Sequence, residues 1–275
     1  MRKFLATTLI AGLFSGAAFA QTTVSSANVV GYVKVDKPGN GKFSIMGVTF
    51  TSISQELNSL VDPLQFNGHP TDPSKADQLI FFDAGTQNYS TYALYDIRSY
   101  GMEYTSNTAW KALSNFSFSG AAFNPIVAPG SAVWLKGSGS TSNTNVTMVG
   151  DVVMTESATN SILMGLQLVS NPFSETVALS NLTLKASATG HPTNPTLADQ
   201  VIIFNATTQT YTTYALYDIS SYGAEYEQYT GWKSITNFTF AGPYADVTLE
   251  SGQGFWIKAT RPFTWVETNK YLGNL

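Results

Sequence analysis

The sequence predicts an all-β fold of two tandem, homologous antiparallel β-sandwich-like (or barrel-like) modules. Residues 68–101 and 190–223 form a gapless repeat displaced by 122 positions, with 24 of 34 positions identical, and such self-similarity is typical of a duplicated structural unit. Short β-rich runs are separated by turn residues at intervals of about 8 to 12 residues, which favours an antiparallel sandwich over alternating βαβ units. We therefore expect a first module over residues 21–150 and a second over residues 151–275.

The first twenty residues have the pattern of a cleaved signal peptide. Arg2 and Lys3 give a basic start, residues 5–14 form a short apolar run, and Ala18-Phe19-Ala20 is the small-residue cleavage site before Gln21. The apolar run is shorter than the roughly 20 residues that a membrane-spanning helix needs. We expect a secreted protein of a bacterium, extracellular or in the cell envelope, without a membrane span.

The composition limits the kinds of bond and binding site that the chain can form. The chain has no cysteine and two histidines, so disulfides and metal sites rich in Cys or His are excluded. Its formal net charge is −4, without a basic cluster, which argues against nucleic acid as a partner. Charged residues make up only 12% of the chain, against roughly 25% in ordinary soluble domains. We expect neither a metal nor a cofactor.

Two hairpins are expected in the first module. Residues 29–36 (VVGYVKVD) and 43–50 (FSIMGVTF) flank a Pro-Gly-Asn-Gly turn and are interpreted as paired strands. Residues 78–83 (QLIFFD) and 88–94 (NYSTYAL) flank a second turn, and this arrangement recurs in the second copy. Along residues 88–94 both faces of the strand carry a tyrosine, so alternation does not show which face is buried.

The later strands carry tryptophans at matched places. The pairs keep the offset of 122 positions and are Trp110 with Trp232 and Trp134 with Trp256. We interpret Trp110 and Trp232 as core anchors rather than sugar platforms. Extended runs at residues 145–149 and 263–267 close the modules, and residues 51–60 are expected to form a short helix that begins near Ser52 or Ser54.

A set of polar and aromatic residues is retained in both copies and has two interpretations. In the structural one, the residues form turns and cap strands through hydrogen bonds from side chain to backbone. In the functional one, they converge on a polar pocket with an aromatic wall, once per module, that holds a sugar or a cation. These candidate ligand-binding residues are His69, Asp77, Tyr92, Tyr95 and Asp96, with His191, Asp199, Tyr214, Tyr217 and Asp218 in the second copy.

Catalysis has little support in the sequence. There is no cysteine nucleophile, and no nucleophile-elbow motif accompanies the single histidine of each module. Two carboxylates can be proposed for a glycosidase, such as Asp77 with Asp96 or Glu103, but pairs of this kind arise by chance in any β protein. We therefore expect no enzyme activity and assign no catalytic residue.

A family resemblance rests on short motifs. Residues 168–173 (LVSNPF), residues 251–258 (SGQGFWIK) and the opening SANVVGYVKV resemble a largely uncharacterised group of secreted bacterial proteins, in which such β modules follow a signal peptide. The first copy departs from the motifs, with GVTF at 47–50 and GSAVWLK at 130–136. The resemblance implies export and β architecture without an established activity.

Two functions follow as expectations. The first is a non-enzymatic secreted or cell-envelope protein that acts through its surfaces in adhesion, matrix building or assembly, with itself or with an extracellular protein or glycan as partner. The abundance of tyrosine favours it, because each buried phenol needs a partner and some of the rings should lie at the surface. The alternative is a glycan-binding protein with one aromatic and polar pocket per module.

Overall fold

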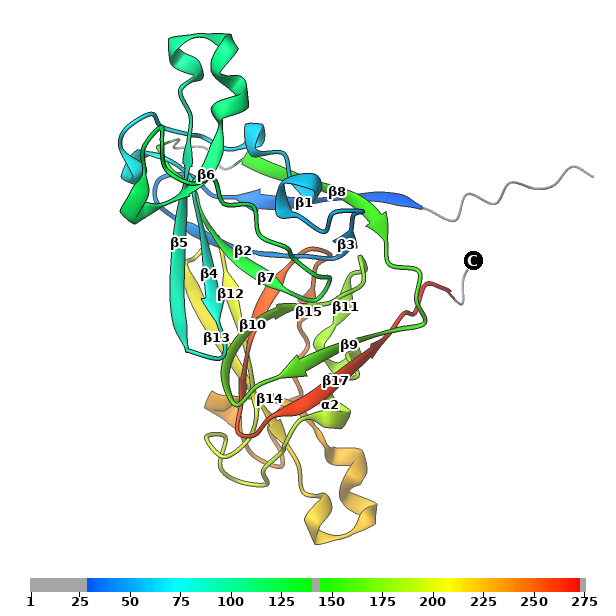
Figure 1. The fold of residues 1–275 in the computed structure, drawn as a ribbon. Coiled ribbons are helices and arrows are strands. Elements are labelled where there is room, and N and C mark those ends of the chain that lie inside the picture. Colours follow the sequence, from blue (N-terminus) through cyan, green and yellow to red (C-terminus); the bar gives the residue numbers. More distant parts are fainter. Residues whose placement is uncertain (1–28, 140–143, 273–275) are drawn as a thin grey trace, which may run out of the picture.

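The computed structural model describes residues 29–139 and 144–272, which are mostly β (Figure 1). The expected signal peptide, residues 1–20, lies outside the described residues. Every ladder between the strands is antiparallel, and the sheets pack on one another in layers. The predicted all-β, sandwich-like fold is confirmed.

The strands alternate with short connections along the chain. In the first half they are β1 (Val30–Lys37), β2 (Phe43–Gly47), β3 (Phe50–Thr51), β4 (Gln78–Asp83), β5 (Asn88–Tyr95), β6 (Ala109–Ala112), β7 (Ala132–Lys136) and β8 (Thr144–Val152). In the second half they are β9 (Ser157–Ile162), β10 (Gly165–Ser170), β11 (Val177–Ala178), β12 (Gln200–Asn205), β13 (Thr210–Tyr217), β14 (Gly231–Ser234), β15 (Thr248–Leu249), β16 (Gly254–Ala259) and β17 (Phe263–Thr268).

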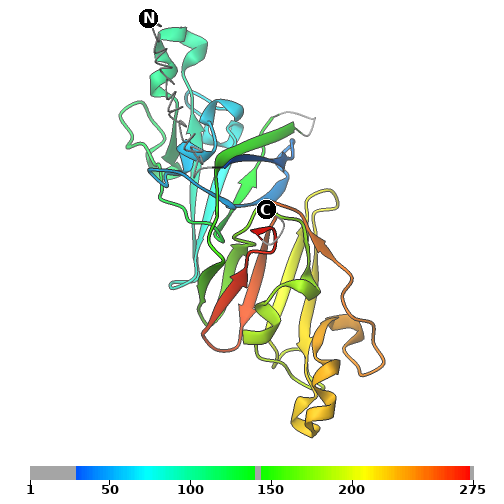
Figure 2. The same ribbon diagram turned by 90° about the vertical axis from the view of Figure 1, so that its right-hand side faces the viewer.

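Helical segments are short. The α-helices of the described residues are α1 (Leu57–Leu60) and α2 (Leu184–Ser187). Single 3₁₀ turns occur at Pro63–Gln65, Pro73–Lys75, Leu113–Asn115, Leu179–Asn181 and Ile235–Asn237. Longer 3₁₀ lobes, Arg98–Tyr100 with Met102–Asn107 and Ser220–Tyr222 with Ala224–Tyr229, project at opposite ends of the molecule (Figures 1 and 2). No helix among the described residues has the length and apolar character needed to cross a membrane.

Two five-stranded sheets share one strand order. The first sheet runs β2-β7-β4-β5-β6, and the second runs β10-β16-β12-β13-β14. A three-stranded sheet, β1-β8-β3, covers the first, whereas the two-stranded sheets β9–β17 and β11–β15 lie in the second half. Each half therefore has a large sheet and smaller sheets across a core, and the two halves lie one above the other in Figure 2.

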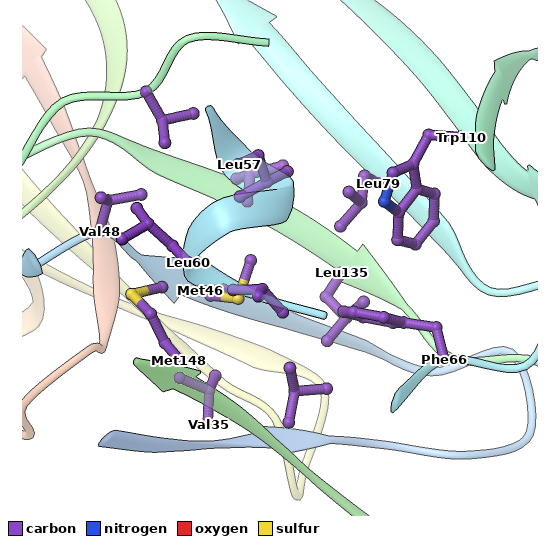
Figure 3. Close-up of a cluster of buried hydrophobic side chains, with 14 of the residues drawn as sticks. Val35, Met46, Val48, Leu57, Leu60, Phe66, Leu79, Trp110, Leu135 and Met148 are labelled. Carbon is purple, nitrogen blue, oxygen red and sulfur yellow. The ribbon is translucent and has the colours of Figure 1, made fainter. Parts of the chain in front are cut away.

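The first core lies between the sheet β2-β7-β4-β5-β6 and the sheet β1-β8-β3. It contains Met46, Leu79, Leu135 and Met148, with Trp110 closing one side (Figure 3). The second core is built in the same way around Val201, Phe255, Trp232 and Trp265. Trp110 and Trp232 are 1% and 2% exposed, so both are core anchors.

The large sheets also pack against each other through their outer faces. This third cluster joins Ile45, Trp134, Leu168, Phe204 and Trp256. On β7, Val133 and Leu135 enter the first core, whereas Trp134 enters the cluster between the sheets. Strands buried on both faces do not show a simple alternation of apolar and polar residues. Strand β5 changes along its length from exposed residues 88–90 to buried residues 93–95, which explains why alternation did not reveal a buried face of residues 88–94.

The predicted first hairpin is wrong. Strand β1 pairs with β8, and β2 pairs with β7, so the turn at residues 38–41 carries the chain from one sheet of the sandwich to the other. The predicted strand 43–50 is also divided, because the Gly47 N–H donates to the Gly252 carbonyl at 2.8 Å and the chain then crosses back to form β3. Both runs have strand propensity, but partners distant in sequence decide their pairing.

The predicted second hairpin and closing strands agree with the structure, whereas the predicted helix agrees only in part. Strands β4 and β5 form the second hairpin with the register Gln78↔Ala93 to Asp83↔Asn88, and β12 and β13 repeat it. Strands β8 and β17 include the predicted closing runs. The predicted helix at 51–60 is shorter than expected: α1 begins after Glu56 without a side-chain cap, rather than near Ser52 or Ser54.

Candidate functional site

Asp77 is fully buried and joins four parts of the first half. Its Oδ2 accepts from Lys37 Nζ at 2.6 Å and from the Asn67 N–H at 2.8 Å. Its Oδ1 accepts from the backbone N–H and hydroxyl of Ser138 at 2.6 and 2.9 Å. The carboxylate thus joins the end of β1 and two loops to the start of β4. Both of its oxygens already accept hydrogen bonds within the fold, as buried polar atoms usually do.

Asp199 occupies the equivalent position but has neutral donors. Its Oδ2 accepts from the Thr189 N–H at 2.7 Å, and its Oδ1 accepts from the Thr260 N–H and hydroxyl at 2.6 and 2.7 Å. Thr189 and Thr260 stand 122 positions after Asn67 and Ser138. The two copies therefore keep the same hydrogen-bond frame, although the first adds an ion pair.

The two histidines stabilise turns. His69 Nδ1 accepts from the backbone N–H groups of Thr71 and Asp72 at 3.2 and 2.8 Å. His191 repeats both contacts at the same distances with Thr193 and Asn194. With Nδ1 as an acceptor, the neutral ring carries its proton on Nε2.

Asp96 and Asp218 follow strands β5 and β13. Arg98 clamps Asp96, with Nη2 2.6 Å from Oδ2 and Nε 3.0 Å from both oxygens. Burial opposes ionisation of Asp96, but the hydrogen bonds and charge of Arg98 prevail and hold its pKa below the ordinary value. Asp218 accepts instead from the Ser220 N–H at 2.8 Å, and its pKa is also lowered, by hydrogen bonds that outweigh burial.

The candidate tyrosines of the first copy lie in different surroundings. Tyr92 stacks on Phe123 with 3.5 Å between ring centroids and packs against the first core. Tyr95 is 5% exposed and lies under the Lys111 ammonium, 4.3 Å from the ring centroid.

The second copy repeats this arrangement. Tyr214 packs against the second core, and Tyr217 lies under Lys233 at 4.3 Å. The first core therefore holds Tyr92 and the second holds Tyr214, whereas Tyr95 and Tyr217 meet a lysine.

Backbone contacts bring three of the predicted residues of each copy together. The His69 N–H donates to the Leu94 carbonyl at 3.1 Å, and the Asp96 N–H donates to the His69 carbonyl at 3.3 Å. His69 and Tyr95 also form a parallel bridge, as do His191 and Tyr217. Asp77 is directed instead to Lys37 and Ser138. These hydrogen bonds agree with the structural interpretation, and the ligand pocket stays a prediction.

Strand β1 presents an open edge, since it pairs only with β8 in the described part of the chain. The Val29 carbonyl accepts from the Val152 N–H at 2.7 Å. In an antiparallel ladder the direction of the backbone groups alternates, so those of residues 30, 32, 34 and 36 point away from β8. The Asp36 carbonyl accepts from the Ser44 hydroxyl at 2.7 Å, which leaves residues 30–34 as the open part.

A groove of about 620 Å³ runs beside this edge. Residues 33–36 of β1 line it, together with Val247, Thr248 and residues 250–254 of the second half. Further along β1, Val30 and Tyr32 are 65% and 71% exposed, and Tyr32 lies opposite the exposed Val149 of β8. Backbone hydrogen-bonding groups and apolar side chains are thus available on the same strand.

An aromatic cleft of about 610 Å³ lies between the two large sheets. The first half contributes Phe43, Ile80, Tyr89, Thr91 and Trp134, and the second contributes Phe204, Gln209 and Tyr211. Tyr89 and Tyr211 are each 57% exposed. None of these lining residues is among the predicted site residues, although Gln87 with Gln209 and Tyr89 with Tyr211 are retained in the repeat.

Reciprocal contacts hold the cleft. Gln209 accepts from the Phe43 N–H and donates to the Phe43 carbonyl, both at 2.9 Å. Gln87 makes the corresponding pair with Leu166 at 3.0 and 2.9 Å. The Gly47 N–H donates to the Gly252 carbonyl, and the Ser170 N–H donates to the Gly130 carbonyl. The two halves therefore meet through nearly the same contacts exchanged in both directions, as in an isologous dimer.

Comparisons with protein-family models, curated proteins and solved structures found no match to this chain. The resemblance through the LVSNPF and SGQGFWIK motifs stays a prediction.

Proposed function

We propose that the protein is a non-enzymatic, secreted or cell-envelope component that acts through its surfaces in adhesion, matrix building or assembly, and that β1 is its contact strand. The open edge of β1 carries this proposal. An edge strand with unpaired backbone groups and exposed apolar side chains is a template for a strand of another chain. A groove of about 620 Å³ lies beside residues 33–36 of this edge.

The open part of β1 suits the same strand of a second copy of the chain as its partner. Lys34 and Asp36 lie two positions apart on the exposed face of the strand. In an antiparallel contact over the open residues 30–34, centred on Tyr32, Tyr32 faces the same residue of the other copy and Lys34 faces Val30, so no like charges face each other. The chain thereby pairs with itself without burying like charges against each other.

Proline at position 34 tests the contact strand. In Lys34→Pro the missing N–H is one that points away from β8, so the ladder within the molecule is kept. We expect wild-type protein to associate as its concentration rises, and Lys34→Pro to weaken the association at least tenfold by analytical ultracentrifugation.

Lys34→Ala is the matched control, because it keeps the N–H and removes only the charge; its association should weaken less than that of Lys34→Pro. A wild-type chain that stays monomeric at millimolar concentration, or equal association by the proline and alanine variants, would contradict the proposal.

Glycan binding is a second candidate, favoured by the aromatic cleft rather than by the retained polar residues. The side chains of His69, Asp77 and Asp96 are engaged within the fold. The cleft instead offers exposed tyrosine rings at a site where both halves meet.

A further inference from the structure

We propose that the aromatic cleft between the two large sheets binds a neutral pyranose oligosaccharide, at one composite site per chain rather than one site per module. The site is independent of the β1 edge. Its volume of about 610 Å³ falls within the roughly 300–1,000 Å³ typical of small-molecule sites.

The two exposed tyrosines are rigid platforms. Tyr211 packs on Phe204 at 5.0 Å and on Trp134 at 6.3 Å between ring centroids. Tyr89 packs in the same way on Phe82 at 5.0 Å and on Trp256 at 6.4 Å. Each tyrosine is therefore held by aromatic neighbours and still more than half exposed, so little side-chain entropy is lost when a ligand covers it.

The polar groups suit a sugar better than a purely apolar ligand. The phenols of Tyr89 and Tyr211 and the hydroxyl of Thr91 can donate and accept hydrogen bonds, as the hydroxyls of a sugar require. Burial raises the pKa of both Tyr89 and Tyr211, and the neighbouring Tyr89 raises that of Tyr211 further, so both phenols keep their protons at neutral pH. A sugar ring presents C–H groups to an aromatic face and hydroxyls at its rim, which matches this arrangement.

The lining excludes a charged ligand. None of its eight side chains carries a charge, so a uronic acid or a sulfated sugar would lose hydration without gaining a counter-ion. The Gln209 amide is already bonded to Phe43 and Ala206 and is a positioning residue.

The aromatic cleft is formed at only one of the two equivalent places in the described interface between the halves. In the reciprocal set of contacts Leu166 replaces Phe43, so an aliphatic side chain stands where the cleft has a ring. The two halves thus build a single aromatic site although their sequences repeat, and binding should show one site per chain.

Titration of the mature chain with neutral oligosaccharides tests the proposal. The probes are hexasaccharides of β-1,4-glucose, β-1,3-glucose, β-1,4-xylose and β-1,4-N-acetylglucosamine, with a hexagalacturonate as the charged comparison. Tryptophan fluorescence is the readout because Trp134 lines the cleft, and calorimetry gives the stoichiometry. We expect at least one neutral probe to bind at one site per chain, with hexagalacturonate at least tenfold weaker.

Matched tyrosine variants locate the site. Tyr89→Ala and Tyr211→Ala should each raise Kd at least tenfold, whereas Tyr100→Ala and Tyr222→Ala, at exposed tyrosines of the projecting lobes, should leave it unchanged. Tyr211→Phe keeps the ring and should bind more tightly than Tyr211→Ala; far-UV circular dichroism confirms that each variant is folded.

The proposal is overturned if no neutral probe binds, if hexagalacturonate binds best, or if the cleft and lobe variants bind equally. These outcomes do not depend on self-association, which the Lys34→Pro experiment measures separately.

Discussion

Asp77 and Asp199 occupy equivalent positions in the two copies, but their hydrogen-bond partners differ in charge. Both carboxylates are fully buried and bonded to a residue 61 positions later, Ser138 or Thr260. Only Asp77 has a lysine, Lys37, at ion-pair distance among the contacts described. A buried ion pair adds little net stability when intact, but it is costly to break, because the remaining charge has no partner.

The two aspartates therefore differ in what their substitution costs. We expect Asp77→Asn to lower the free energy of unfolding by about 3–5 kcal/mol, because Lys37 is left buried and unpaired. Asp199→Asn should cost less, since it leaves no opposite charge behind. Urea denaturation of both variants measures this difference.

Adding Lys37→Met to Asp77→Asn should recover part of the loss, because the double variant removes both charges. Equal costs for the two aspartates, or no recovery in the double variant, would show that the ion pair is not responsible.

At the scale of the element, the turn of the β12–β13 hairpin binds the first half through the side chain of Gln209. Gln209 has a left-handed backbone with φ of 57°, as Gln87 has in the β4–β5 turn with φ of 56°. Such a conformation is strained for a residue other than glycine. The glutamine is accommodated there because its amide binds Phe43 in the neighbouring sheet.

Two substitutions at this turn separate strain from bonding. Gln209→Ala loses the amide bonds and keeps the strain, so we expect it to lower the free energy of unfolding by about 1–3 kcal/mol. Gln209→Gly loses the same bonds but relieves the strain, and should be more stable than Gln209→Ala by about 1 kcal/mol. Thermal unfolding compares the two; an alanine variant as stable as the glycine variant would argue against the strain.

At the scale of the whole molecule, the two halves are bound by their outer sheet faces. The cluster of Ile45, Trp134, Leu168, Phe204 and Trp256 removes large apolar side chains from water, and burial of this kind is the main favourable term in association. The covalent connection at residues 153–156 is therefore one of several links between the halves.

Cutting that connection tests the strength of the interface. A protease site inserted after Met154, which is 37% exposed, allows cleavage of the folded chain. We expect the two fragments to elute together in gel filtration and to separate only in denaturant. Introducing Trp134→Ala into the same chain should weaken their association, and separation of the wild-type fragments in buffer would contradict a stable interface.

The sequence by itself determined local features, namely the all-β class, the β4–β5 and β12–β13 hairpins and the burial of Trp110 and Trp232. These depend on propensity, turn chemistry and side-chain size, which are properties of short stretches. The pairing of β1 with β8, the contact of the two large sheets and the aromatic cleft were decided only by the tertiary structure. They join residues far apart in the chain. A strand buried on both faces also lacks the apolar and polar alternation from which its packing partners could be predicted.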